Sequence, residues 1–165
     1  MNKIIFSKSI LDKLHNTYRS RKHVTFHLLG KDDKGIIRAA VEIPAADHCY
    51  TPEVPSSSFA GAMISLDKAG YEVAGVYIVD TSASYPSYNE TVNEWYRLTE
   101  YTRRGRENVL GDKGTILVKE GKHHRTTVTA GVVKSYHELI PLQVETVEIH
   151  IKGTIADKLK HLFKV

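Results

Sequence analysis

The sequence predicts an α/β protein in which a single mixed sheet is flanked by helices, with residues 1–165 forming one domain. The length of 165 residues suits one domain with a substantial core. Segments with helical periodicity alternate along the chain with β-rich segments. The run at 71–79 is almost uniformly apolar after Glu72, which is typical of a central strand covered on both faces. Together these observations predict helices packed on the faces of one sheet.

The first half of the chain predicts a helix, a hairpin and a loop. Residues 7–21 carry apolar side chains at helical spacing, and Ser7 or Ser9 can cap the start of this helix. Residues 23–29 and 36–43 are β-rich and are joined by a polar turn, which predicts a hairpin. Residues 44–58 hold three of the five prolines, so we expect an irregular surface connection there.

The second half continues the alternation. Residues 57–70 predict a helix that begins at a serine cap and ends at a glycine, and the strand at 71–79 follows it. The remaining predictions are a helix at 89–105, a hairpin turning through Glu120, Gly121 and Lys122, a half-buried strand at 143–151 and a closing amphipathic helix at 155–163.

Composition excludes some classes of protein. The net charge of +4 permits an acidic partner or a nucleic acid but does not require one. No apolar run is long enough to cross a bilayer, and the first residues lack the pattern of a signal peptide. Cys49 is the only cysteine, so no intrachain disulfide can form, and we expect a cytoplasmic protein without a membrane partner.

Three stretches together resemble a known family. They are "IIFSKSILDKL", "HVTFHLLG" and "SSSFAGAMISLDKAGYEVAGVYIVDTSASYPSYNE", and the resemblance covers residues 3–100. The pattern is similar to the JAB/MPN (JAMM) domain of zinc-dependent deubiquitinating isopeptidases, which implies layering like that of cytidine deaminases. In that family two histidines and a carboxylate hold the zinc, a glutamate takes the proton of the zinc-bound water, and a serine steadies the oxyanion.

The resemblance carries these roles onto five positions of this chain, but two of them do not fit the family's chemistry. Ile78 cannot ligate a metal, and no histidine lies between Cys49 and Lys122 to replace it. His23 would be a general base with a different reach from the family's glutamate. We therefore expect no zinc isopeptidase site, no metal and no cofactor. The matching positions are His23 for the glutamate, Ile78 and Asp80 for the two histidines, Ser87 for the serine and Glu90 for the third ligand. The polar four, His23, Asp80, Ser87 and Glu90, are interpreted as a vestigial rim.

The resemblance therefore implies a catalytically inactive JAB/MPN-like pseudoenzyme that acts as a protein-interaction or regulatory scaffold. Its partners would be another MPN-type subunit or a ubiquitin-like protein. Aromatic and arginine side chains are enriched at protein interfaces. The candidates for the contact surface are Tyr85, Tyr88, Tyr96, Arg97, Tyr101, Arg103, Arg104 and Arg106.

Two functions of other classes stay open. One is a hydrolase, either with a divalent metal on Asp80 and Glu90 or as a two-histidine phosphoesterase. The second form rests on His23 and His124, each of which begins a His-x-Thr triplet. The other function is an RNA- or polyanion-binding module that uses the arginines of 97–106 with the interleaved tyrosines.

Overall fold

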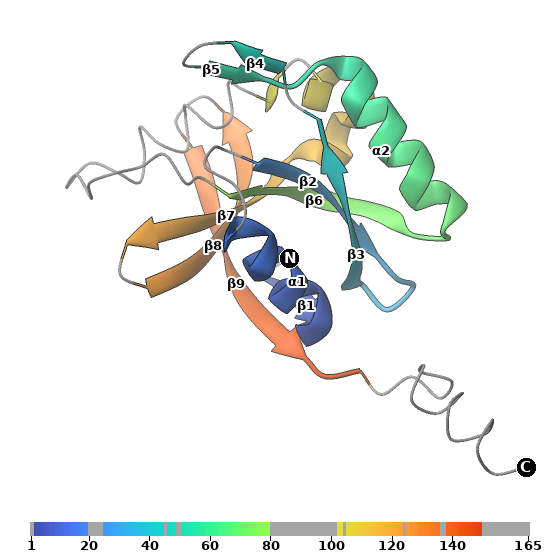
Figure 1. Cartoon of the computed structure of the whole chain (residues 1–165). Coiled ribbons are helices and arrows are strands. Elements are labelled where there is room, and N and C mark those ends of the chain that lie inside the picture. Colours follow the sequence, from blue (N-terminus) through green and yellow to red (C-terminus); the bar gives the residue numbers. More distant parts are fainter. Residues whose placement is uncertain are drawn as a thin grey trace, which may run out of the picture.

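A closed barrel of seven strands dominates the protein (Figure 1). In this computed structural model the described residues are 2–19, 25–44, 46–48, 51–79, 102–103, 105–123, 125–135 and 138–149. The strands follow one another around the barrel in the order β1, β3, β2, β6, β7, β8, β9. Their bounds are β1 Lys3–Ser7, β2 Thr25–Lys31, β3 Ile36–Ile43, β6 Glu72–Val79, β7 Ile116–His123, β8 Arg125–Ser135 and β9 Glu138–Val147.

The predicted fold class is wrong. The sheet is not an open mixed sheet between layers of helices, because β1 and β9 pair with each other and close it into a barrel. The described helices are few and short: α1 is Lys8–Arg19, α2 is Ser56–Lys68, and a π-helical turn η1 at Arg106–Leu110 leads into a 3-10 turn η2 at Gly111–Gly114. No helix among the described residues has the length and apolarity needed to cross a bilayer.

The barrel mixes antiparallel and parallel pairs. β2 pairs antiparallel with both β3 and β6, while β6 and β7 run parallel. β1 is parallel to β9 along five residue pairs, from Lys3 with Gln143 to Ser7 with Val147. Its pairing with β3 is shorter and covers Ile5 with Ile36 and Phe6 with Ile37. The strand formed by the first residues of the chain therefore joins the last strand of the barrel to β3.

The interior of the barrel holds one hydrophobic core, and α1 packs against it. All seven strands contribute to this core, and Leu11 and Leu14 of α1 complete it. The edge-to-face contact of Phe6 with Tyr77, with ring centroids 6.0 Å apart, lies within it. Ser7, the residue before α1, caps this helix as predicted: its Oγ accepts a hydrogen bond from the Ile10 backbone N–H at 3.4 Å.

A second core lies on the outside of β2, β3 and β6, where α2 covers the barrel (Figure 1). Phe59 and Leu66 of α2 are fully buried there against Phe26 and Ile78. Gly30 of β2 permits this close packing, because a Cβ there would collide with Leu66. Covering both faces buries β6 along its length, which confirms the predicted central strand.

Several predicted elements are confirmed, with shifted ends. The helices predicted at 7–21 and 57–70 are α1 and α2, and the first hairpin is β2–β3. α2 ends as predicted, with Gly70 at φ +85° and the Tyr71 N–H donating to the Leu66 carbonyl at 3.0 Å. Its start differs, because Pro55 occupies the N-cap position and no side chain caps the helix.

One prediction about a connection is wrong, and a strand and a hairpin turn are displaced from their predicted positions. The connection expected to be irregular contains a two-stranded sheet of β4 at Ala46–His48 and β5 at Thr51–Glu53. β9 begins at Glu138, five residues before the predicted strand. The second hairpin exists, but Glu120 lies within β7 and not in the turn, since β7 and β8 stay paired as far as His123 with Arg125. The predicted helix at 155–163 and most of the one at 89–105 lie outside the described residues.

Candidate functional site

Most residues of the predicted site lie outside the described part of the chain. This holds for the whole vestigial rim and for His124 of the alternative phosphoesterase. It also holds for most of the expected contact surface. The residues concerned are His23, Asp80, Ser87, Glu90, His124, Tyr85, Tyr88, Tyr96, Arg97, Tyr101 and Arg104.

Arg106, which is expected on the contact surface, lies within the described residues and is buried. The residue is only 6% exposed. Its Nη1 donates to the Gly114 carbonyl at 3.2 Å and its Nε donates to Thr102 Oγ1 at 3.3 Å. The first bond joins η1 to η2 and the second joins η1 to Thr102, so this guanidinium is part of the structure beneath the surface. Arg103 is half-buried.

The most distinctive polar group in the described residues is the carboxylate of Glu120 on β7, which is fully buried. It has two partners from other elements. The hydroxyl of Tyr77 on β6 donates to Glu120 Oε2 at 2.8 Å, and Nδ1 of His15 on α1 lies 2.6 Å from Oε1. We call these three residues the His15–Glu120–Tyr77 relay. A buried carboxylate requires such partners, because removing an unpaired charge from water costs roughly several kcal/mol.

The chemistry of the His15–Glu120–Tyr77 relay follows from its burial. Burial raises the pKa of Tyr77 far above its ordinary value, and the charge of Glu120 and the hydrogen bond to it raise it further. Tyr77 therefore keeps its proton and acts as a donor. His15 lies at the outer end, where 30% of its side chain is exposed. The relay thus runs from a buried phenol through a buried carboxylate to an imidazole at the surface.

A second buried hydroxyl lies in the same part of the barrel. Thr25 pairs with Val79, and Val79 pairs with Glu120, so the three residues form one row across β2, β6 and β7. Directly paired residues share a face of the sheet, and Val79 belongs to the interior core. Thr25 is 8% exposed, and its Oγ1 makes no hydrogen bond among the described residues.

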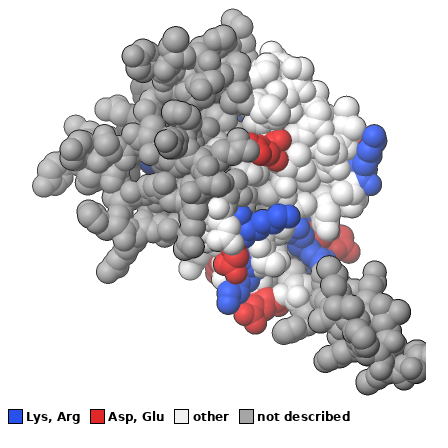
Figure 2. Space-filling model, in the orientation of Figure 1, with Lys and Arg blue, Asp and Glu red and all other residues white. Residues whose placement is uncertain are grey.

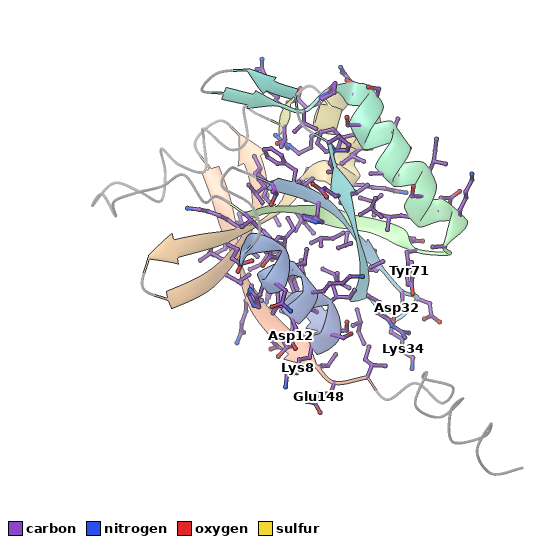
Figure 3. The ribbon with its side chains drawn as sticks, in the orientation of Figure 1. Lys8, Asp12, Asp32, Lys34, Tyr71 and Glu148 are labelled. Carbon is purple, nitrogen blue, oxygen red and sulfur yellow. The ribbon has the colours of Figure 1, made fainter. Side chains whose placement is uncertain are left out.

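The surface contains a hollow beside α2. It has a volume of about 330 Å³ and is lined by Met63, Ile64, Asp67, Tyr71, Glu72, Val73 and Lys113. Ile64 is 53% exposed and is the only large exposed apolar side chain in the described part of the chain. Figure 3 shows Tyr71 beyond the C-terminal end of α2, beside the turn that carries Asp32 and Lys34.

Charges of both signs are mixed on the face drawn in Figure 2. Lys8 of α1 lies 3.4 Å from Glu148 just after β9, as Figure 3 also shows. Lys3 pairs with Glu145 at 3.6 Å. These exposed pairs do not form a patch of one sign, so they add no support for the polyanion-binding alternative, which stays a prediction.

The described residues contain no group of three or more His, Cys, Asp or Glu side chains arranged to hold a metal ion. Ile78, which stands where the resemblance places a ligand, is fully buried in the outer core beneath α2. The proposed metal on Asp80 and Glu90 involves residues outside the described part.

Comparisons with known proteins inform the fold only. No family model matches the sequence, and no curated protein matches it. Among solved structures, the chain is similar to the solution structure of protein DSY2949 from Desulfitobacterium hafniense. The TM-score is 0.58 with 9% sequence identity, over 88% of this chain and 93% of that one. At this identity the likeness supports the barrel and says nothing of activity.

Sequence reasoning missed the three residues of the relay. The signal available was a polar residue within each of two apolar runs, Tyr77 in "GVYIV" and Glu120 in "ILVKE". Their pairing depends on β6 and β7 lying side by side and parallel, although about 40 residues separate the two strands. His15 gave no signal beyond its place on a helix.

Proposed function

We propose that the protein is a cytoplasmic interaction domain that pairs with an MPN-type subunit, as the resemblance to the JAB/MPN domain implies, through the outer face of α2. The observation that carries this proposal is that the exposed Ile64 adjoins Met63, Tyr71 and Val73 in the lining of the hollow. Apolar side chains gathered on a surface, with polar residues around them, mark protein contact sites.

The residue at one of the ligand positions speaks against zinc chemistry in this protein. Ile78 stands where the resemblance requires a ligand, and it packs in the outer core, where its side chain contributes to stability. A scaffold role is what the resemblance implies for a member that lacks its metal ligands. The hydrolase alternatives concern Asp80, Glu90, His23 and His124 and stay predictions.

The shape of α2 favours another helix as the partner surface. Ile64 lies one turn after Gly61, and a Cβ at Gly61 would meet no atom within 4 Å. Ser57 and Ser65 are also exposed on this helix. Small side chains allow two helices to approach closely, at about 8 Å between their axes.

The charges around the hollow favour a partner with the same kind of surface. Asp67 and Glu72 line it together with Lys113. In a two-fold contact the same patch of both subunits meets, so the acidic side chains of one copy must lie near basic side chains of the other. A patch that carries both signs satisfies this condition, and the simplest MPN-type partner to test is a second copy of this chain.

Sedimentation velocity of the full chain over a range of concentrations tests the proposal. We expect a concentration-dependent dimer and at least a tenfold weaker association for Ile64→Asp, because the change buries a charge in the contact. Asn16→Asp is the matched control, since Asn16 is exposed on α1 and gains the same charge away from α2. A chain that stays monomeric, or an Ile64→Asp variant that dimerises like the parent, would show that the proposal is wrong.

A further inference from the structure

The His15–Glu120–Tyr77 relay contains a fully buried carboxylate, which packing alone does not require. A buried carboxylate is a poor way to stabilise a core, because an apolar group of similar size is often as good or better. Glu120 is nevertheless fully buried, with each of its oxygens occupied by a side chain from a different element. Both contacts fix the position of the carboxylate. The carboxylate in turn fixes the orientation of the one partly exposed member, His15.

The orientation of His15 determines which of its nitrogens is reactive. Because Tyr77 donates to one oxygen of Glu120, the carboxylate acts as an acceptor, and the His15 Nδ1–H donates to the other oxygen across 2.6 Å. The neutral ring then carries its lone pair on Nε2. A carboxylate on the far nitrogen of an imidazole holds this tautomer and stabilises the positive charge that develops when the ring reacts.

The barrel interior holds a further buried polar group. Thr25 is in the row that contains Glu120, faces the barrel interior, and has an Oγ1 with no hydrogen bond among the described residues. His27 also belongs to this interior face, opposite Tyr77 in the register of β2 and β6. A buried hydroxyl with unused hydrogen-bonding capacity is costly in a purely structural role.

We propose that His15 is the nucleophile of an acyl-transfer site, with Glu120 and Tyr77 as positioning residues and small activated acyl esters or thioesters as the substrate class. Nε2 attacks the acyl carbon, and the bond from that carbon to the leaving oxygen or sulfur breaks with its electron pair on the leaving group. The acylimidazolium so formed is stabilised by Glu120. Water then attacks the same carbon, breaks the carbon–nitrogen bond and releases the carboxylic acid, while a proton passes to solvent. This proposal is independent of pairing through α2.

The full chain with p-nitrophenyl acetate tests the site. We measure the second-order rate of p-nitrophenolate release for the parent and for His15→Gln, Glu120→Gln and Tyr77→Phe, after circular dichroism has established that each is folded. The other eight histidines also react with the ester, and the rate of His15→Gln measures their contribution. We expect His15→Gln to fall to that background, which should resemble the reactivity of N-acetylhistidine. Glu120→Gln should lower the His15-dependent rate about tenfold or more, as the loss of a partner that orients an imidazole does elsewhere.

Tyr77→Phe tests the buried support of the carboxylate. It removes one of the two hydrogen bonds that position Glu120 but leaves the Glu120–His15 contact, so it should lower the His15-dependent rate, by less than Glu120→Gln does. A structural role would instead lower the stability of all three variants with no change in rate. Unchanged release by His15→Gln would overturn the proposal.

A spectroscopic measurement on the parent chain covers the case in which Glu120→Gln does not fold. The 15N chemical shifts of the neutral His15 ring should report a proton on Nδ1 and a lone pair on Nε2. A proton on Nε2 in the neutral ring would contradict the proposal without any variant.

Discussion

Asp32 shows how one carboxylate organises a turn. Its Oδ1 accepts hydrogen bonds from the backbone N–H groups of Lys34 at 2.9 Å and Ile36 at 3.0 Å, and Arg38 lies 3.6 Å from Oδ2. Burial alone would raise the pKa of Asp32, but these hydrogen bonds and the charge of Arg38 outweigh it, and the pKa lies below its ordinary value of 3.8. The charged form is therefore the one that the folded turn between β2 and β3 prefers.

Asp32→Asn should lower the free energy of unfolding by about 1–2 kcal/mol at neutral pH, because charge-assisted hydrogen bonds become neutral ones. A carboxyl whose pKa is lowered on folding stabilises the protein above its unfolded pKa, and this stabilisation is lost as the pH falls through the lower folded value. The difference between parent and variant should therefore shrink below about pH 4. Urea unfolding across acidic and neutral pH measures it, and Asp33→Asn, at the exposed neighbouring position, is the control. A difference that persists at low pH would contradict this account.

At the scale of the element, α2 and η1 are joined by a contact that only glycine permits. Gly105 has ordinary helical dihedral angles, so an alanine would not strain the backbone. A Cβ at this position would overlap the ring of Phe59, which is fully buried on α2. The restriction is therefore steric and comes from the neighbouring helix.

Gly105→Ala should destabilise the protein by about 1–3 kcal/mol through overpacking. Gly61→Ala is the matched control on α2, where a Cβ meets nothing within 4 Å. We expect this control to stabilise the protein by up to about 1 kcal/mol, because alanine favours the helix interior. Thermal or chemical denaturation measures the change in the free energy of unfolding for both variants, and the two changes should have opposite signs. Equal effects of the two substitutions would show that the Phe59 contact does not limit position 105.

At the scale of the whole molecule, barrel closure depends on β1. Only two residue pairs join β1 to β3, whereas five join it to β9. Phe6 is completely buried in the interior core and contacts Tyr77, while Lys3 on the same strand is exposed.

Phe6→Ala should cost about 3–5 kcal/mol, which is a large part of the stability of an ordinary domain. Because β1 and β9 protect each other, we expect the amides of β9 to lose hydrogen-exchange protection in parallel with those of β1. Lys3→Ala removes only an exposed ion pair at 3.6 Å and should change stability by less than about 1 kcal/mol. Hydrogen exchange followed by mass spectrometry measures both variants. Full protection of β9 in Phe6→Ala would show that the barrel stays closed without this side chain.

The elements that sequence reasoning identified are those with a strong local pattern. α1 and α2 have apolar side chains at helical spacing, and β6 is a long apolar run. The five residues of β1 are too few for a periodic pattern and precede a helix directly. The closed barrel was missed for a second reason as well: the contact that closes it joins segments about 140 residues apart in the sequence.

The site was harder to predict than the elements. Arg106 has the sequence context of a surface arginine, and only the fold of η1 against η2 buries it. Glu120 lies beside a glycine and a lysine, as a turn residue would, yet it points into the barrel. In both cases the deciding neighbours come from the tertiary structure and not from the adjacent sequence.

The parallel pairing of β1 with β9 has a consequence for the order in which the protein is made. On the ribosome β1 emerges before the other strands of the barrel, and its main partner β9 emerges after all of them. Until then Ile4 and Phe6 lack this partner strand, although α1 and Tyr77 of β6 already belong to the same core. Contacts between distant segments form slowly because the loop between them must first close. The nascent chain therefore cannot close this barrel until β9 has been made, so β1 waits for its main partner while the intervening strands are synthesised.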